Sequence, residues 1–204
     1  MAKDPYAPRI KEHLEFNFDQ SESKCFDTSF KDINMKTIDC FEFDGCRFVN
    51  VSFENIDDPY SFVDCEFIVC DFSNVALKST YFHRCHFQRC KGIGTNFIKS
   101  KLSYTTIDDS NFSLSNFSES ILDHVRLKQS IFSSSRIVYS QLDTFETSNI
   151  DFNESDFSET NLKDCDFSTN QINHILVSIP LIKGLTLNES QALSFTKLLG
   201  IKIS

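Results

Sequence analysis

The sequence predicts a single domain built as an all-β solenoid, and three observations point to it. Apolar residues recur every five positions: from Phe62 to Ile172 this interval gives 23 positions, of which 21 are Phe, Leu or Ile. Two residues before these central positions, 19 of the 23 residues are Ser, Thr, Cys or Val. The composition is also unusual for a helical or doubly wound enzyme, because the 204 residues include 22 Phe and no Trp.

An interval of five fits neither a helix, which repeats near 3.6, nor a strand, which repeats at 2. Three extended residues followed by a turn of about two would instead make one side of a coil. The central residue and the small residue two places before it lie on the same face, so both point inward. Coils stacked about 4.8 Å apart satisfy each other's backbone groups. The period leaves open how many sides close a coil.

The chain divides into three predicted parts. Residues 1–32 form an irregular N-terminal cap, residues 33–174 form the repeat solenoid, and residues 175–204 form a C-terminal cap. The first central positions are Ile33, Ile38, Phe43, Phe48 and Phe53. The next step, to Phe62, is nine residues, so the phase slips once, within residues 54–61. The candidate loop at this slip contains Asp57, Asp58 and Pro59.

Two further irregularities are expected inside the solenoid. At Thr147 the size order inverts, because Phe145 takes the position that is normally small. We expect a bulge there and regard residues 143–150 as the second loop candidate. Gly92 breaks the apolar series and is expected to mark an irregular corner.

The C-terminal part changes pattern and predicts a helix. Asn188 is a suitable N-cap for a helix through residues 189–199, and Gly200 fits the residue just past its end. An uncovered coil would expose a row of unpaired backbone groups, so closure by this helix has a physical motive.

The repeat resembles the pentapeptide-repeat family, whose units carry a small residue, a polar residue, a central Phe or Leu and two polar residues. The resemblance covers residues 43–172, and residues 70–97 and 181–204 look like the Qnr-type proteins of Gram-positive bacteria. It implies a right-handed quadrilateral β-helix with four repeats per coil. The implied core includes Phe62, Phe67, Phe72, Phe82, Phe87, Phe97, Phe112, Phe117, Phe132, Phe152, Phe157 and Phe167.

The resemblance also implies partners. Qnr-type proteins bind DNA gyrase and topoisomerase IV and protect them from fluoroquinolones, and the family's C-terminal segment joins two subunits into a homodimer. The corresponding dimerisation residues here are Leu193, Phe195, Leu198, Leu199 and Ile201.

The candidate chemistry is better explained by packing than by catalysis. Six of the eight cysteines occupy the small inward position of the repeat, where free cysteine behaves as a small hydrophobe. Serines fill the same position without a nucleophile motif, and no phosphate-binding loop is present. We therefore expect a non-catalytic protein without metal, cofactor or small-molecule substrate. The N-terminus lacks an apolar leader, and the longest apolar-rich run, residues 175–182, is too short to span a membrane, so we expect a cytoplasmic protein.

The charge is unevenly distributed along the chain. Residues 103–171 contain 12 acids and 4 bases, a net charge of −8 out of −9 for the whole chain. Over the roughly 17 Å that these coils would span, duplex DNA carries about ten charges. This match favours a rod that mimics DNA, although acidic residues also serve solubility. The proposed contact residues are Asp108, Asp109, Glu119, Asp123, Glu154, Asp156 and Glu159.

A basic patch contradicts uniform mimicry. It comprises Lys78, Arg84, Arg89, Lys91, Lys99 and Lys101. Because the surrounding charge is negative, we expect this patch to meet an acidic surface of the partner protein rather than nucleic acid. The alternative function is an immunity or scaffold protein of the same family that acts on another target or against another gyrase poison.

Overall fold

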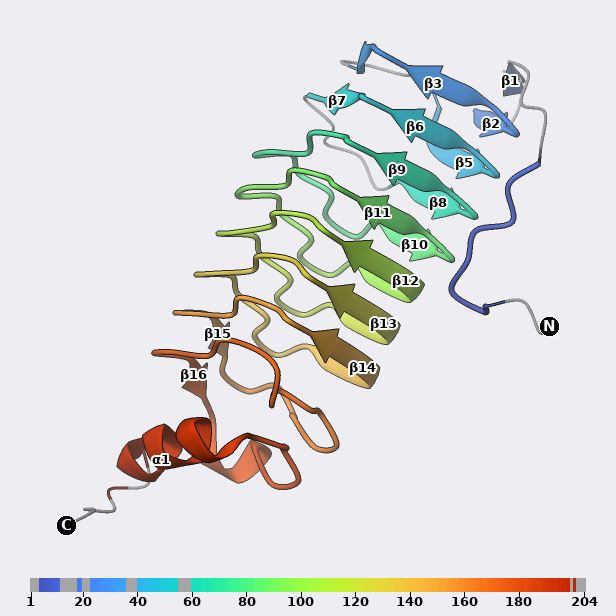
Figure 1. The fold of residues 1–204 in the computed structure, drawn as a ribbon. Helices are drawn as coiled ribbons and strands as arrows, with labels where there is room; N and C mark the ends of the chain where they lie inside the picture. The colour runs from blue at the N-terminus through green and yellow to red at the C-terminus, as the bar shows by residue number, and fades with distance from the viewer. Residues whose placement is uncertain are drawn as a thin grey trace.

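A computed structural model describes residues 4–11, 18–19, 23–35, 40–54, 60–198 and 200. Over these ranges the chain winds as a right-handed quadrilateral β-helix closed at its C-terminal end by one helix (Figure 1). Strands on the same side of successive coils pair in parallel. Among the described residues, no helix is long and apolar enough to cross a bilayer.

Each coil has four sides, which we name A to D in chain order. Side A carries β2 (Lys24–Phe26), β5 (Glu42–Asp44), β8 (Ser61–Val63) and β10 (Tyr81–His83). Side B carries β3 (Ser29–Lys31), β6 (Arg47–Val49), β9 (Glu66–Ile68) and β11 (His86–Gln88). Three longer strands run over both sides: β12 (Lys101–Asp108), β13 (Ile121–Lys128) and β14 (Gln141–Ser148).

Sides C and D contain shorter pairings. On side C, β4 (Asn34–Met35) pairs with β7 (Ser52–Phe53), and on side D, β15 (Asp156–Phe157) pairs with β16 (Leu176–Val177). Isolated parallel bridges continue both ladders. The remaining elements are β1 (Phe18–Asp19), which pairs antiparallel with β2, a 3-10 turn (Ile179–Leu181) and α1 (Glu189–Leu198).

The coil length is 20 residues from Phe62 onward but shorter before it. Phe82 lies opposite Phe62 and Leu102, so four five-residue units close one coil. Phe62 lies opposite Phe43, and Phe43 opposite Cys25, which makes these coils 19 and 18 residues long. The slip predicted within residues 54–61 is therefore real, and an additional one occurs before Phe43.

This additional slip corrects the predicted start of the solenoid. Strands β2 and β3 already belong to its ladders, although they lie within the predicted cap of residues 1–32. Ile33, a predicted central residue, is 42% exposed, whereas Met35 pairs with Phe53 and is buried. Ile38 and the candidate loop residues Asp57, Asp58 and Pro59 lie outside the described residues.

Aromatic rings fill the axis of the first coils. Phe62 stacks on Phe43 and Phe82 with ring centroids 5.1 and 5.2 Å apart, and Phe67 stacks on Phe48 and Phe87 at 4.9 and 4.6 Å. All twelve phenylalanines named above as core residues are at most 3% exposed. Burial of apolar side chains of this size contributes the main stabilising free energy of such a fold.

Gly92 does not mark an irregular corner. Its turn repeats the geometry of the coil that follows, with Lys91 bridged to Asn111. A Cβ atom on Gly92 would lie 2.2 Å from Cε1 of Phe112, so the ring of the next coil fills the space of the missing side chain. The glycine serves core packing rather than the turn.

The bulge expected at Thr147 is also absent. Strand β14 pairs with β13 without interruption, with Phe145 opposite Val125 and Thr147 opposite Leu127. Phe145 is 7% exposed in the small-residue position, and the Thr147 hydroxyl donates to the carbonyl of Asp166 at 2.8 Å. Residues 143–150 therefore form no loop, because the larger and smaller side chains simply exchange places.

The corners have a conformation that the period did not predict. The second residue after most central positions has a positive φ, as at Asn74 (60°), Leu114 (59°) and Glu154 (61°). Such a conformation costs non-glycine residues about 1–2 kcal/mol each. The stack compensates through ladder hydrogen bonds, such as that from the Leu114 amide to the carbonyl of Ser133 at 2.9 Å.

Helix α1 covers the last coil, as predicted. The Asn188 side chain accepts from the Gln191 amide at 3.0 Å, and the Gln191 side chain accepts from the Asn188 amide at 2.8 Å, which is a reciprocal capping box. Gln191 also donates to the carbonyls of Phe167 and Asn170 at 2.9 and 2.8 Å. Gly200 has the expected positive φ of 71°.

Candidate partner-binding surface

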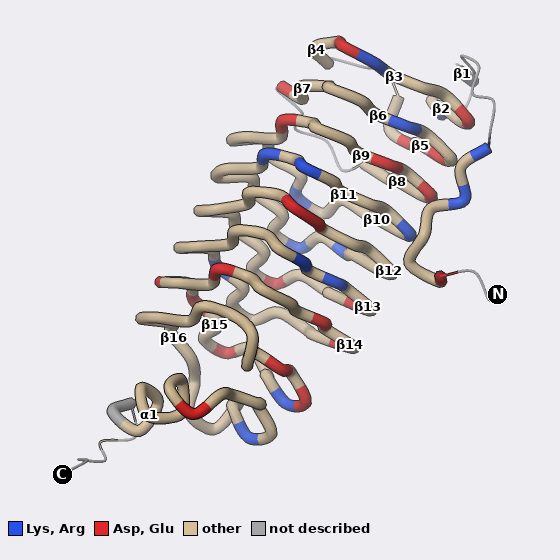
Figure 2. The backbone as a smooth tube through the Cα atoms, in the orientation of Figure 1, with Lys and Arg blue, Asp and Glu red and all other residues tan. Residues whose placement is uncertain are grey.

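The structure separates the seven predicted acidic contact residues over the perimeter of the solenoid. Asp108 lies on side B and Asp109 at the corner between sides B and C, whereas Asp123 lies on side A. The other four, Glu119, Glu154, Asp156 and Glu159, surround side D. The predicted residues therefore do not form one face, and Figure 2 shows acidic and basic segments alternating along the stack.

One coil nevertheless concentrates carboxylates on adjoining sides. Asp151 on side C, Glu154 at the C–D corner, Asp156 on side D and Glu159 at the D–A corner follow one another within a single half-coil. We call these four residues the acidic quartet. Within the described part of the chain, none of them lies within salt-bridge distance of a Lys or Arg. The quartet thus presents four carboxylates without a salt bridge, although Arg136 of the preceding coil lies opposite Asp156 in the side D ladder.

Local structure explains why the two aspartates of the quartet occupy their positions. Asp151 and Asp156 each precede a central phenylalanine, and each accepts a hydrogen bond at 2.9 Å from the amide two residues later. This is the Asx-turn geometry, which Asn and Asp favour. One oxygen of each carboxylate therefore has a structural role, while the overall charge remains available to a partner.

The two glutamates of the quartet lie at left-handed corners. Glu154 accepts from the Ser134 hydroxyl at 3.1 Å, and Glu159 accepts from the Ser178 hydroxyl at 2.8 Å. Both residues are exposed. Asp151 was missed by the sequence analysis, although it shares with Asp156 the signal of an acid directly before a central residue.

The other predicted acids are partly engaged. Glu119 lies 3.5 Å from Lys99 of the coil above, and Asp123 accepts from the neighbouring His124 Nδ1 at 2.6 Å. Asp109 is exposed. Asp108 is half-buried, and its Oδ1 atom has no hydrogen-bond partner. These residues add less free charge than the quartet does.

Half of the basic patch is paired within the solenoid. Arg84 binds the Asp64 carboxylate at 2.7 Å with both Nε and Nη2, and Lys91 lies 3.6 Å from Asp71. Lys99 belongs to the pair with Glu119 described above. The patch residues also face different sides, so they do not form one cationic surface.

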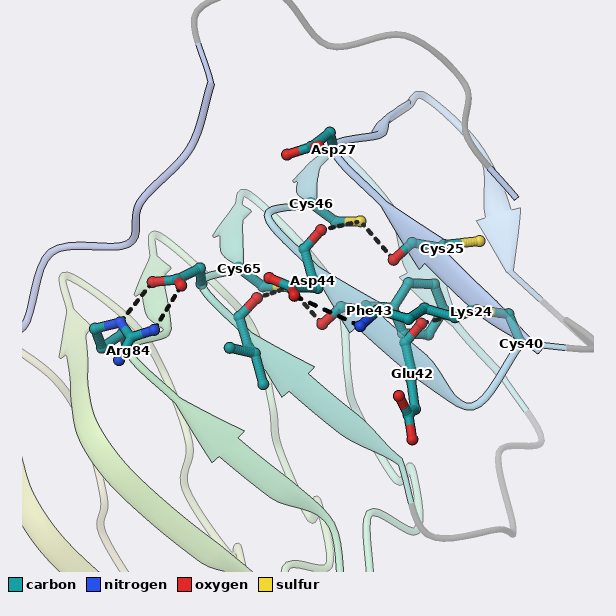
Figure 3. Close-up of polar contacts among 12 residues, drawn as sticks. Lys24, Cys25, Asp27, Cys40, Glu42, Phe43, Asp44, Cys46, Cys65 and Arg84 are labelled. Carbon is teal, nitrogen blue, oxygen red and sulfur yellow. Dashed lines mark hydrogen bonds and ion pairs between the residues drawn. The ribbon is translucent and has the colours of Figure 1, made fainter. Parts of the chain in front are cut away.

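Seven of the eight cysteines line the core in the coils before Ser100, and Cys165 lies in a later coil. Cys46 Sγ donates to the carbonyl of Cys25 at 3.5 Å, and Cys65 Sγ donates to the carbonyls of Phe43 and Val63 at 3.5 and 3.3 Å (Figure 3). All eight cysteines are buried as free thiols. Burial raises the pKa of Cys65 and Cys90 well above the ordinary value, so these thiols stay protonated and unreactive.

One group of side chains on side A has the composition of a cation site. Ligand atoms of Asp123, His124 and Asp143 lie within 4.8 Å of one another. Two carboxylates and an imidazole could hold a divalent cation. In the described structure the imidazole already satisfies Asp123, and Asp143 is exposed to water.

The C-terminal residues predicted to join two subunits fall into different environments. Leu193 of α1 is 56% exposed, whereas Phe195 is 7% exposed and packs into the core of its own chain. Phe195 is thus an anchor of the cap and is not available for a partner subunit. The side chain of Leu198 and the residues Leu199 and Ile201 lie outside the described structure.

Comparison with known proteins identifies the repeat. The family pattern "Pentapeptide repeat region" matches residues 60–137, and "Pentapeptide repeats (8 copies)" matches residues 147–169. The interval between the two matches includes Phe145, where the usual order of large and small residues is inverted. No curated protein matches the chain in sequence.

Solved structures with a similar fold include QnrB1, described as a plasmid-mediated fluoroquinolone resistance protein. It shares 20% identity over 89% of this chain and 90% of its own, with a TM-score of 0.39. HetL, a pentapeptide-repeat protein involved in heterocyst differentiation regulation from the cyanobacterium Nostoc sp., shares 8% identity over 82% of this chain and 90% of its own, with a TM-score of 0.27. With its five-residue period, four-sided coils and repeat matches, the chain belongs to the pentapeptide-repeat family.

Proposed function

We propose that this protein is a non-catalytic mimic of DNA that binds DNA gyrase or topoisomerase IV and protects the enzyme against fluoroquinolones. The observation that carries the proposal is the acidic quartet, which concentrates unpaired carboxylates on one coil of a rigid rod. A type II topoisomerase binds duplex DNA on a positively charged surface, and a narrow acidic rod complements such a surface.

The charge density of the quartet supports this assignment. Coils are spaced by about 4.8 Å, a length over which duplex DNA carries about three charges. The quartet places four carboxylates in one coil, on sides C and D and the corners that follow them. The neighbouring coils carry fewer acids there, so the match is local and predicts where the partner enzyme makes contact.

The rigidity of the quartet also favours binding. The Asx hydrogen bonds of Asp151 and Asp156 and the serine contacts of Glu154 and Glu159 restrict the four side chains before a partner arrives. A preorganised surface loses less conformational entropy on association. The same hydrogen bonds define conservative substitutions, because Asn and Gln retain an oxygen acceptor without the charge.

A supercoiling assay with purified gyrase, with and without ciprofloxacin, tests the proposal. The wild-type protein should restore supercoiling in the presence of the drug. The fourfold variant Asp151→Asn, Glu154→Gln, Asp156→Asn and Glu159→Gln should require at least a tenfold higher concentration. The matched control neutralises four exposed aspartates elsewhere: Asp32→Asn, Asp143→Asn, Asp164→Asn and Asp166→Asn.

The control should protect as well as the wild type does, because it removes the same number of charges from outside the quartet. Equal loss in both variants would show that net charge, and not the quartet, supports binding. A wild-type protein without effect at micromolar concentration would remove the topoisomerase assignment. In that case, recovery of a different protein in a pull-down would favour the alternative role as an immunity or scaffold protein.

We also propose that two chains associate through the exposed side of α1. Leu193 projects from this helix, and Leu176 and Ile179 of the last coil are 56% and 47% exposed. Burial of these side chains between two chains would be favourable. Leu193→Lys should convert a dimer to a monomer in light scattering while the circular dichroism spectrum of the solenoid stays unchanged, because the wild-type side chain is 56% exposed in its own chain. A monomeric wild type, or a variant that stays dimeric, would contradict this interface.

A further inference from the structure

The N-terminal segment, residues 4–11, lies as a strap along the corner between sides A and B. Figure 1 shows this segment running beside the stack, away from the first coils and toward the later ones. Lys11 contacts Asp27 of the first coil, the Arg9 amide donates to Asp64 at 3.0 Å, and Asp4 lies 3.3 Å from Arg126. The strap therefore spans several coils, from that of Asp27 to that of Arg126.

Tyr6 is the main anchor of the strap. It is 5% exposed, with the Arg126 guanidinium 3.8 Å from its ring centroid and the Tyr104 ring 6.0 Å away. Its hydroxyl donates to Glu146 Oε1 at 3.1 Å, and Arg126 also binds Glu146 at 2.8 Å. The site thus combines a cation over an aromatic face, an aromatic wall and a carboxylate acceptor.

The titration behaviour of the strap contacts agrees with this geometry. Burial and the Glu146 carboxylate raise the pKa of Tyr6 to about 12, so its hydroxyl remains a donor. Burial raises the pKa of Asp64, but hydrogen bonds from Arg84 and from the Arg9 amide outweigh burial and hold the net pKa below its ordinary value. Asp64 therefore stays charged and available to the strap.

The strap is attached differently from every strand of the solenoid. Among the residues that the structure describes, its hydrogen bonds to the coils all involve a side chain, and none is a backbone ladder bond. Pro5 and Pro8 also lack amide donors. A segment held by a few side-chain anchors separates from its site without breaking the sheet, so the site beneath it is accessible to another chain.

We propose that the site formed by Tyr104, Arg126 and Glu146 is a peptide-binding site, which the strap occupies in cis and which accepts a partner segment that carries an acidic residue two positions before a tyrosine. The strap itself supplies this description of the ligand. Asp4 pairs with Arg126, and Tyr6, two residues later, inserts its ring beneath the same guanidinium. A partner segment of this kind would reproduce both contacts.

Competition between the strap and an added peptide tests the site in the full-length protein. The probe is a fluorescein-labelled peptide with the sequence of residues 3–11, KDPYAPRIK, followed by anisotropy. Tyr6→Ala removes the anchor and should give saturable binding of the probe. The wild type should bind at least tenfold more weakly, because its own strap competes at an effective concentration in the millimolar range.

Two controls separate the site from nonspecific binding. Tyr139→Ala removes a tyrosine that is 65% exposed on another corner and should behave as the wild type does. A probe with alanine in place of its tyrosine should bind at least tenfold more weakly to the Tyr6→Ala protein. In that background, Arg126→Lys keeps the charge and the fold but loses the planar stacking, so binding should also fall at least tenfold.

Four outcomes would overturn the proposal. The Tyr6→Ala protein could show no saturable binding, the wild type could bind the probe equally well, or binding could survive Arg126→Lys. A concentration-dependent dimer of the wild type that is lost in Arg126→Lys would assign the site to the strap of a second copy and would overturn the assignment to a different partner. Circular dichroism and thermal melting of each variant establish that the solenoid is intact.

Discussion

The coils before Ser100 and those after it share one backbone but differ in the chemistry that fills them. In the earlier coils the columns on sides A and B consist of stacked phenylalanines, such as Phe67 between Phe48 and Phe87. In the later coils the same columns continue with Leu102, Leu122, Ile107 and Leu127 in unbroken register. The solenoid therefore accepts either stacked rings or aliphatic side chains at equivalent positions.

The small-residue position changes together with the centre. In the earlier coils Cys85 Sγ lies 3.3 Å from the carbonyl of Phe62, and in the later coils Ser120 Oγ donates to the carbonyl of Phe97 at 2.7 Å. Each acceptor lies 23 residues before its donor. The later serines also receive hydrogen bonds, as when the Cys90 amide donates to Ser110 Oγ at 2.9 Å.

This comparison shows that the five-residue period and the ladder hydrogen bonds set the coil geometry in both regions. The two regions differ in which interactions stabilise the coils. The earlier coils depend more on dispersion and apolar burial, and the later coils depend more on buried hydrogen bonds. A small apolar cavity lies in the later coils, where rings give way to aliphatic side chains. Its lining includes Leu102, Ile107, Phe117, Leu122, Val125, Leu127, Phe132, Ile137 and Phe145.

The largest expected effect is the loss of a central ring. Phe67→Ala should lower the free energy of unfolding by about 3–5 kcal/mol, because six neighbouring phenylalanine rings lose contact and a cavity remains. The matched change Leu127→Ala, in the same column, should cost less, about 2–3 kcal/mol, because fewer contacts are lost. Guanidinium denaturation followed by circular dichroism measures both. Equal losses would break the distinction between the two regions.

Gly92→Ala should have the next largest effect. The added methyl group would overlap the Phe112 ring, and overpacking of this kind costs about 1–3 kcal/mol. The double variant Gly92→Ala with Phe112→Leu should recover part of the loss, because leucine withdraws from the glycine. A double-mutant cycle with no coupling energy would show that Gly92 has a role other than accommodating Phe112.

A pair of buried serines tests whether hydrogen bonds matter in the later coils. Ser120→Ala should cost about 1 kcal/mol, because it removes the donor to Phe97. Ser115 is equally buried, but its hydroxyl has no hydrogen-bond partner, so Ser115→Ala should be neutral or slightly stabilising. Thermal melting of the two variants gives the comparison directly. Identical shifts in melting temperature would mean that only the side-chain volume at the small-residue position affects stability, and that the hydrogen bond does not.

The smallest effect on stability is expected when a cysteine at the small-residue position is replaced by serine. Cys85→Ser should change the free energy of unfolding by less than about 1 kcal/mol, because the carbonyl of Phe62 is already positioned as an acceptor. Serine is only slightly smaller than cysteine, and its hydroxyl can donate to the Phe62 carbonyl as Ser120 donates to the Phe97 carbonyl in a later coil. Destabilisation well above 1 kcal/mol would show that the two kinds of coil are not interchangeable.

The sequence by itself determined that five residues form one side of a coil, because only a five-residue unit places one large and one small side chain inward on every side. It also determined α1, since Asn188 is a suitable N-cap and Gly200 fits the residue just past the end of the helix. The irregular corner expected at Gly92 and the bulge expected at Thr147 were wrong for the same reason. Both residues were compared only with the pattern of their own repeat and not with the residues that pack against them. The tertiary stack decides their roles, because Phe112 of the next coil fills the space at Gly92 and Phe145 takes over the volume missing at Thr147.

The candidate surfaces depended even more on tertiary structure. Charge counting located the acidic coils, but it grouped seven acids that the four-sided coils distribute over different sides. The shorter coils of 18 and 19 residues before Phe62 were likewise visible only in the strand register. The strap left no periodic signal at all, because Tyr6 meets Arg126 and Glu146 only when residues more than 100 positions apart lie side by side at one corner.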